Sequence, residues 1–167
     1  MSQMSLHFLP VLQTLLVIGG ANSAPLMLKR VLGDRFAHPI DGGMILSDSR
    51  PLLGSSKTWR GLAGAVLLAT VAAVVVGLPW RVGALAGASA MAGDCLSSFI
   101  KRRMGLRPSQ MALGIDQVPE SLAPAMACGL YLPLTPLDVG LVVVVFFIGE
   151  LALSRLLFAF GLRDRPY

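Results

Sequence analysis

Five long apolar stretches, separated by short polar segments, constrain this chain more than any other feature of its sequence. They lie near residues 6–28, 62–79, 82–100, 122–134 and 137–160. A helix that crosses a bilayer needs about 20 mostly apolar residues. The pattern therefore predicts an all-α integral membrane protein with about five transmembrane helices.

The low charge content also favours a membrane protein over a soluble one. Charged residues make up 14% of the chain, against about 25% in soluble domains. At 167 residues, we expect a single membrane-embedded domain over residues 1–167. No basic cluster precedes the first apolar stretch, so we expect it to be kept as a membrane helix. Cys95 and Cys128 lie in apolar surroundings, and we predict neither a disulfide nor a metal site for them.

The distribution of basic residues predicts the orientation in the membrane. With five spans, one side receives twelve of the fourteen Lys and Arg residues, namely Lys29, Arg30, Arg35, Arg50, Lys57, Arg60, Lys101, Arg102, Arg103, Arg107, Arg163 and Arg165. Because basic loops remain in the cytoplasm, we expect the N-terminus outside, the C-terminus inside, and the polar loops on the cytoplasmic face of the cell inner membrane. The net charge of +5 follows this pattern, so we predict no nucleic-acid partner.

The first cytoplasmic segment carries side chains that suit a phosphate ligand. Lys57, Thr58 and Arg60 all offer donors to phosphate oxygens. The run 54–58 is similar to the end of a P-loop, but no glycine stands at the two positions where a P-loop needs one. A basic juxtamembrane loop that holds anionic lipid headgroups is the alternative interpretation.

The second candidate region lies at the cytoplasmic end of the third apolar stretch. If this segment is helical, Asp94, Ser98 and Lys101 stand at i, i+4 and i+7 and share one face. An ionisable side chain within a membrane helix is costly, and it is a functional hypothesis by default. The alternative is an Asp94–Lys101 pair that merely neutralises itself.

Two carboxylates in this region predict a cation site. Asp94 and Asp116 together suit Mg²⁺, which proteins usually hold through one or two carboxylates plus substrate phosphates. Asp116 is alternatively part of a turn or a helix N-cap ahead of the fourth helix, and residues 101–103 are alternatively a positive-inside anchor. Glu150, the one acid deep in the fifth stretch, is interpreted as a structural partner for a neighbouring helix.

These motifs together resemble the CDP-archaeol synthase family, integral-membrane relatives of the phosphatidate cytidylyltransferases. Two blocks are the most specific, Lys57-Thr58-Trp59-Arg60-Gly61 and Gly93-Asp94 followed by Ser98-Phe99-Ile100-Lys101-Arg102-Arg103. Segments 22–25, 39–43, 53–56, 116–117 and 161–167 also fit, so the resemblance covers nearly the whole chain in order.

The resemblance implies an enzyme that transfers CMP from CTP to a membrane lipid phosphate, releasing pyrophosphate with Mg²⁺ as cofactor. It implies five helices around a cavity that faces the cytoplasm. Carried onto this chain, it makes Asp94 and Asp116 the metal ligands and, with Lys101, the catalytic residues. The implied ligands of CTP or lipid phosphate, with their supporting residues, are Lys57, Thr58, Arg60, Lys101, Ser98, Arg102, Gln117 and Asp41. The resemblance leaves the oligomeric state open.

Two segments depart from the family pattern. Family members carry polar His and Asn residues near the end of the fifth helix, where this chain has the run 150–155, and residues 118–120 also differ. Both departures bear on the lipid, which is an archaeal-type ether lipid, phosphatidate or another phospholipid.

Three other functions are alternatives to this one. A CDP-alcohol phosphatidyltransferase needs several closely spaced Asp residues behind an Asp-Gly pair, and only Asp41-Gly42 is present. A small transporter needs polar residues at mid-membrane depth, where only Glu150 lies. A non-catalytic membrane anchor that binds lipid would tolerate the loss of Lys57, Asp94 and Asp116.

Overall fold

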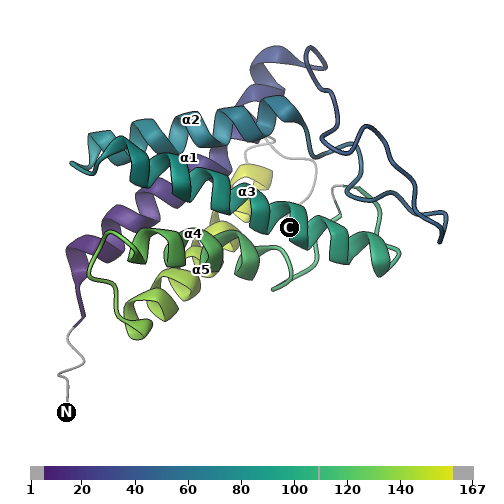
Figure 1. The fold of residues 1–167 in the computed structure, drawn as a ribbon. Coiled ribbons are helices and arrows are strands. Elements are labelled where there is room, and N and C mark those ends of the chain that lie inside the picture. The colour runs from purple at the N-terminus through teal and green to yellow at the C-terminus, as the bar shows by residue number, and fades with distance from the viewer. Residues whose placement is uncertain (1–5, 109, 160–167) are drawn as a thin grey trace.

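The computed structural model describes residues 6–108 and 110–159. Over these residues the chain forms five helices and no strand, in the order α1 (Phe8–Leu32), α2 (Trp59–Val75), α3 (Trp80–Arg103), α4 (Gln117–Gly129) and α5 (Pro136–Ala159) (Figure 1). The all-α prediction is confirmed. The closing segment 161–167, which contributed to the resemblance and to the charge count, lies outside the described residues.

The helix bounds differ from the predicted ones at several points, and three of these differences lie near the polar end of the molecule. α1 continues to Leu32 through Pro25, because a membrane helix tolerates the one backbone hydrogen bond that proline removes. α2 begins at Trp59, where the Gly61 N–H donates to Thr58 Oγ1 at 3.2 Å and caps the helix. α4 begins at Gln117, earlier than predicted, because its polar first turn carries no apolar signal.

Small residues bring α2 and α3 into close contact. Ala65, Ala69 and Ala73 of α2 are fully buried. A Cβ atom added at Gly87 of α3 would lie only 2.7 Å from Val66 Cα, so the two backbones are nearly in contact there. Such small-residue interfaces are typical of helix packing in membranes. This core fixes α3 relative to α2 and so positions the polar end of α3.

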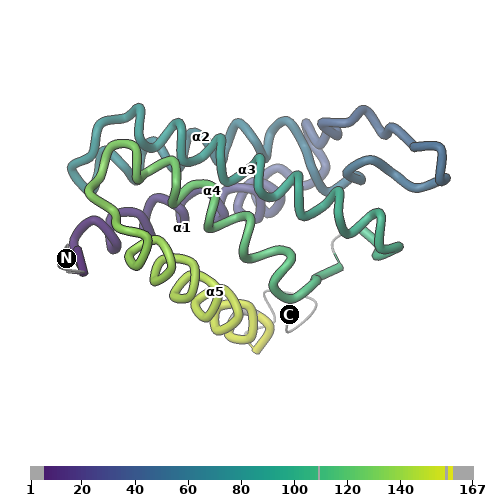
Figure 2. Tube along the Cα trace, turned by 60° about the horizontal axis from the view of Figure 1, so that its bottom comes forward, coloured from purple at the N-terminus to yellow at the C-terminus, as the bar shows by residue number. Residues whose placement is uncertain are grey.

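α5 stands apart from this core. It packs against α4 and α1, and Figure 2 shows it running obliquely away from the layer that α1, α2 and α3 form. Among the described helices, α1 and α5 are long and apolar enough to cross a membrane, and α2 is a shorter apolar helix. The number of spans and the orientation remain predictions.

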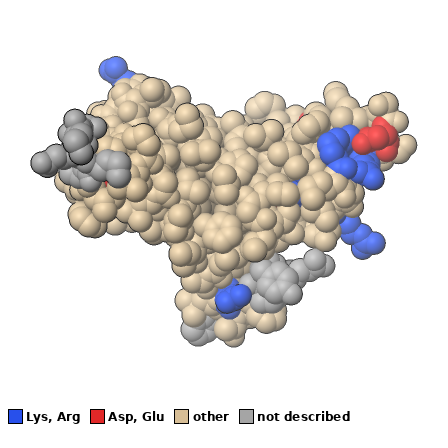
Figure 3. Space-filling view, turned by 90° about the horizontal axis from the view of Figure 1, so that it is seen from below, with Lys and Arg blue, Asp and Glu red and all other residues tan. Residues whose placement is uncertain are grey.

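The long loops collect at one end of the molecule. The first loop, residues 33–58, follows α1 and extends beyond the helices, and the second loop, residues 104–116, follows α3 and turns back towards α4 (Figure 1). Across the broad middle of the face in Figure 3 the side chains are uncharged, and the largest group of charged side chains lies at one end. The fold thus separates an apolar body from a polar end.

Candidate functional site

A polar cavity of about 760 Å³ lies at the loop end of the helices. All five helices and both long loops contribute to its wall, so the site exists only in the assembled fold. Its lining includes Asn22, Pro25, Leu26 and Lys29 of α1, Ser55, Ser56, Lys57 and Thr58 of the first loop, Arg60 of α2, Met91, Asp94 and Lys101 of α3, Gln110, Met111 and Asp116 of the second loop, Glu120 of α4 and Glu150 of α5.

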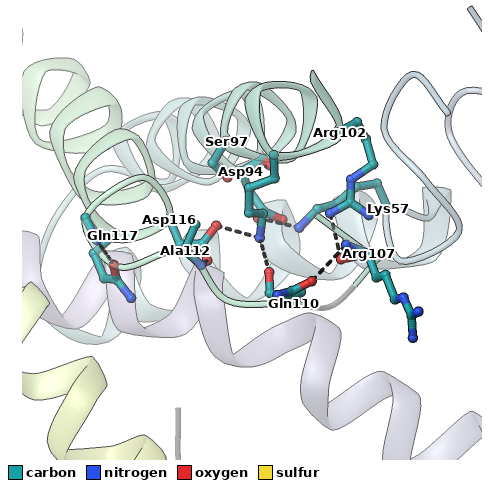
Figure 4. Close-up of polar contacts among 11 residues, drawn as sticks. Lys57, Asp94, Ser97, Arg102, Arg107, Gln110, Ala112, Asp116 and Gln117 are labelled. Atoms are coloured by element: carbon teal, nitrogen blue, oxygen red, sulfur yellow. Dashed lines mark hydrogen bonds and ion pairs between the residues drawn. The ribbon is translucent and has the colours of Figure 1, made fainter. Parts of the chain in front are cut away.

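Two lysine–carboxylate pairs dominate the cavity wall. Lys57 of the first loop forms an ion pair with Asp94 of α3. Lys101 Nζ lies 2.6 Å from Asp116 Oδ1 and donates a hydrogen bond of 3.0 Å to the Gln110 carbonyl. Figure 4 shows the Lys57, Asp94 and Asp116 side chains converging from three elements. Both pairs are mostly buried, which strengthens their electrostatic attraction.

The alternative of a self-neutralising pair on α3 is wrong. Asp94 and Lys101 stand about 10 Å apart along the helix axis, because seven residues rise by about 1.5 Å each. Each side chain instead meets an opposite charge from another element. The two ion pairs therefore tie both long loops to α3.

Asp116 does stand at the N-cap position of α4, as the second alternative predicts, but its side chain does not cap the helix. The Asp116 side chain makes no capping hydrogen bond at the start of α4. Its Oδ2 accepts from the Ala112 N–H at 2.9 Å, and its Oδ1 faces Lys101. The carboxylate is thus held by the loop before α4 and presented to the cavity.

Asp41 supports the first loop from outside the cavity lining. Its Oδ2 accepts from the backbone N–H groups of Leu53 and Gly54 at 2.9 Å and 3.1 Å. Partial burial works against the charged form, but the backbone donors, including the Gly43 N–H, outweigh it and hold the pKa of Asp41 below its usual value. The carboxylate therefore fixes the segment that leads to Lys57.

Three other predicted ligands lie behind the cavity wall. Ser98 and Arg102 are each 2% exposed and Gln117 is fully buried. Arg102 Nη2 donates to the Arg107 carbonyl at 2.9 Å, and Gln117 Oε1 accepts from the Gly114 N–H at 2.8 Å (Figure 4). Arg102 and Gln117 thus hold the second loop in place, whereas Lys57, Thr58, Arg60 and Lys101 line the cavity itself.

Sequence reasoning missed three acids as cavity residues, namely Asp34, Glu120 and Glu150. Glu120 of α4 lines the cavity together with Asp94 of α3. It follows Asp116 by four residues, so the signal was one helical turn, hidden because the fourth helix was expected to begin later. Glu150 was interpreted as a structural partner on α5, but it too faces the cavity.

The donor set suits a polyanionic ligand. Lys29, Lys57, Arg60 and Lys101 place four cationic side chains around one cavity, and such groups bind phosphate oxygens strongly. Over the described residues, no three Asp, Glu, His or Cys side chains are arranged to hold a metal ion. Mg²⁺ does not need such a cage, because it is usually held by one or two carboxylates together with substrate phosphates. The carboxylates of the cavity fit that pattern.

Comparisons with known proteins point to one family. A family model described as "CarS-like: CDP-archaeol synthase" matches residues 25–167. The CDP-archaeol synthase of Hyperthermus butylicus is 40% identical over 104 residues, which is 59% of each chain. That of Pyrococcus furiosus is 37% identical over 107 residues, covering 58% of this chain and 60% of the relative. The alignments thus span about three fifths of the length of these relatives.

A solved structure shares the fold. It is described as an intramembrane enzyme for archaeal membrane lipids biosynthesis, and it matches with a TM-score of 0.74 at 26% sequence identity. The match covers 86% of this chain and 91% of the other. Most of this chain thus shares the architecture of a protein that is described as an intramembrane enzyme.

Proposed function

This chain belongs to the CDP-archaeol synthase family, and from that premise we propose that it is an enzyme that transfers CMP from CTP to a lipid phosphate. The products are a CDP-activated lipid and pyrophosphate. The observation that carries the proposal is a single cavity in which Lys57 and Lys101 face Asp94 and Asp116. The names of the curated relatives and of the similar structure support the same reaction.

The chemistry needs the side chains that the cavity offers. An oxygen of the lipid phosphate attacks the α-phosphorus of CTP, a new P–O bond forms, and the bond to the bridging oxygen breaks to release pyrophosphate. Both reactants are anions, so holding them together and offsetting their repulsion account for most of the catalysis. Lys29, Lys57, Arg60 and Lys101 are placed to bind the phosphate groups.

Asp94 and Asp116 are the carboxylates that we expect to hold Mg²⁺. When bound, this ion would neutralise phosphate charge and act as a Lewis acid. Lys57 and Lys101 form ion pairs with the same carboxylates. Lysine suits this exchange, because its ammonium group sits on a flexible four-carbon stem. Each lysine can turn from its carboxylate to a phosphate oxygen of the ligand.

We place the cavity on the cytoplasmic side of a membrane that all five helices cross, with the N-terminus outside. The cavity end carries the basic loops, and Arg81 lies near the start of α3 at the other end. Cytoplasmic loops are enriched in Lys and Arg. CTP then reaches the cavity from the cytosol, while the lipid tails stay between the helices and the headgroup enters from the bilayer.

An archaeal-type ether lipid phosphate is the substrate that we propose first. The support is the activity named in the curated relatives, CDP-archaeol synthase. Phosphatidate is the alternative lipid, since the departures at residues 118–120 and 150–155 leave the lipid choice to experiment.

The test is a lipid panel with purified protein in liposomes, CTP and Mg²⁺. The panel contains an unsaturated ether-linked glycerol phosphate and phosphatidate, and the protein arms are wild type, Asp94→Asn and Asp48→Asn. Asp48 is an exposed acid that pairs with Arg103 and is not among the cavity residues, so it serves as the control. We expect CDP-lipid from wild type and Asp48→Asn, and none from Asp94→Asn. Folded wild-type protein that converts no lipid would favour a transporter or a membrane anchor.

A further inference from the structure

Asn22 of α1 carries a side-chain donor that the fold itself does not use. The residue lines the cavity. Its Nδ2 atom is buried, and among the described residues it has no hydrogen-bond partner. Buried donors in native proteins nearly always have a partner, because an unpaired one costs free energy. The amide of Asn22 is therefore available to a ligand that enters the cavity.

The other uncharged polar side chains of α1 are used within the fold. Gln13 Nε2 donates to the Val76 carbonyl at 2.9 Å and so ties α1 to the end of α2. Thr14 and Ser23 donate to carbonyls of their own helix at 2.8 Å and 3.0 Å. Helix packing and local hydrogen bonds account for these three residues but not for Asn22.

Asn22 lies deep in the cavity, away from the long loops. α1 and α3 both run towards the loop end (Figure 1). Asn22 shares a face of α1 with Leu26 and Lys29, which also line the cavity, and Lys29 lies about 10 Å nearer to the loops. On α3, Met91 lies about 15 Å deeper than Lys101. The deep part of the lining thus includes apolar side chains beside the amide.

The two proposed substrates differ in where they would meet the cavity wall. Lys57, Arg60 and Lys101 stand in the first loop, in the first turn of α2 and in the last turn of α3, so they suit the triphosphate of CTP. The lipid phosphate is attached to apolar tails. A neutral amide beside apolar side chains suits that group, because it adds a donor without burying a further charge.

We propose that Asn22 is a substrate-binding residue whose amide N–H donates to the phosphate of the lipid substrate. The inference rests on the proposed function for the identity of the two substrates. By holding one oxygen of the lipid phosphate, Asn22 leaves another oxygen free to face the α-phosphorus of CTP. Loss of a hydrogen bond to a charged group corresponds to about a 10–100-fold loss of affinity.

Two substitutions separate the donor of Asn22 from its shape. Asn22→Leu keeps a similar volume without a donor, and Asn22→Asp keeps the shape but places a carboxylate against the phosphate. We expect Asn22→Leu to weaken lipid-phosphate binding by about 10–100-fold, and Asn22→Asp to weaken it further by charge repulsion. The matched control is Ser23→Ala, because Ser23 bonds to its own helix and is not among the cavity residues.

The experiment measures binding to the full-length protein in detergent by titration calorimetry, with three ligands in separate titrations. They are a short-chain ether-linked glycerol phosphate, the same lipid without its phosphate, and CTP with Mg²⁺. We expect Asn22→Leu to lose affinity for the lipid phosphate alone. Its melting temperature should be at or above that of wild type, because the substitution removes an unpaired donor and breaks no hydrogen bond.

Each other outcome has a definite meaning. Wild-type affinity of Asn22→Leu for the lipid phosphate, or no binding of that lipid by wild type, would overturn the inference. A loss of affinity for CTP instead would assign Asn22 to the nucleotide and overturn it too, and a lowered melting temperature would indicate a structural role. Wild-type protein that binds both ligands but transfers no CMP would overturn the proposed function, while the binding series would still decide the role of Asn22.

Discussion

The two ends of the molecule both bury carboxylates, but different partners surround them. At the end away from the cavity, Asp138 of α5 accepts from the backbone N–H groups of His7 and Thr135 at 3.0 Å and 2.8 Å. The Thr135 hydroxyl donates to it at 2.8 Å, and His7 Nδ1 lies 2.9 Å from Oδ2. Two of these partners are backbone groups, which do not leave while the fold is intact.

At the cavity end, lysine side chains are the charged partners of the carboxylates, and Asp116 in addition accepts from the Ala112 backbone N–H. Asp94 and Asp116 face Lys57 and Lys101, and a lysine stem has enough freedom to move its ammonium group to another anion. Aspartate therefore makes a lasting structural contact at one end of the molecule, whereas at the cavity end its lysine partner can exchange for another ligand. What surrounds a buried acid, more than its burial, indicates whether it has a structural or a functional role.

The same substitution at both ends gives the largest expected contrast. Asp94→Asn should lower CMP transfer by at least about 100-fold, because a metal-binding oxygen is lost, with little change in melting temperature. Asp138→Asn should lower the melting temperature, because the donors around it lose part of their acceptor, and should leave kcat near wild type below that temperature. The measurements are product formation and thermal unfolding of both variants. Equal loss of activity in both would break the comparison.

The cationic partners sharpen the contrast in the next prediction. Lys57→Met should raise the KM for CTP by about ten- to a hundredfold, which corresponds to about 1.5–3 kcal/mol for hydrogen bonds to a charged group. His7→Gln, at the other end, should leave the KM unchanged, because His7 lies far along α1 from the cavity. Steady-state kinetics with varied CTP decides this, and a raised KM in His7→Gln would count against it.

Two glycines test whether helix spacing at the cavity matters. Gly93→Ala should destabilise the fold by about 1–3 kcal/mol, because the methyl group collides with the α4 backbone. It should also impair CMP transfer in the folded fraction, since α4 carries Glu120. Gly149→Ala on α5 is the matched control, because nothing lies within 4 Å of the added atom. Denaturation in detergent and the activity assay measure both effects; equal behaviour of the two variants would refute the close contact.

The smallest expected effect concerns the loop that Asp41 holds. Because the pKa of Asp41 lies below its usual value, its stabilising contribution is complete at neutral pH and is lost as the pH falls through that lowered pKa. Asp41→Asn should increase hydrogen exchange at the Leu53 and Gly54 amides at neutral pH, with only a modest loss of activity. Exchange equal to that of wild type would show that other contacts hold the loop.

Much of the fold was predictable from sequence, because an apolar stretch in a bilayer has to form a helix to satisfy its backbone hydrogen bonds. The start of α4 was not, since Gln117 and Glu120 carry no apolar signal and their turn is positioned by packing on Gly93. That error hid Glu120 as a cavity residue. The residues of the cavity lie in polar segments between or at the ends of the apolar stretches. Hydropathy therefore predicts their positions less well than it predicts the helices.

The residues of the site were predictable in type but not in pairing. Lys57, Asp94, Lys101 and Asp116 were all singled out, and the structure places them around one cavity. Spacing along α3 predicts that Asp94 and Lys101 share one face of the helix. It does not predict which loop covers that face, and so it does not predict the partner of either charge. The observed pairs depend on the two loops, and only the assembled fold fixes their positions.

The central claim is that the cavity catalyses transfer of CMP, and isotopic labelling tests it most directly. Purified protein in liposomes containing an ether-linked lipid phosphate receives CTP labelled with radioactive phosphorus at either the α or the γ position. We predict that the α label appears in the lipid product and the γ label in pyrophosphate. Transfer of the γ label to the lipid, or no labelled lipid from either substrate, would contradict the account.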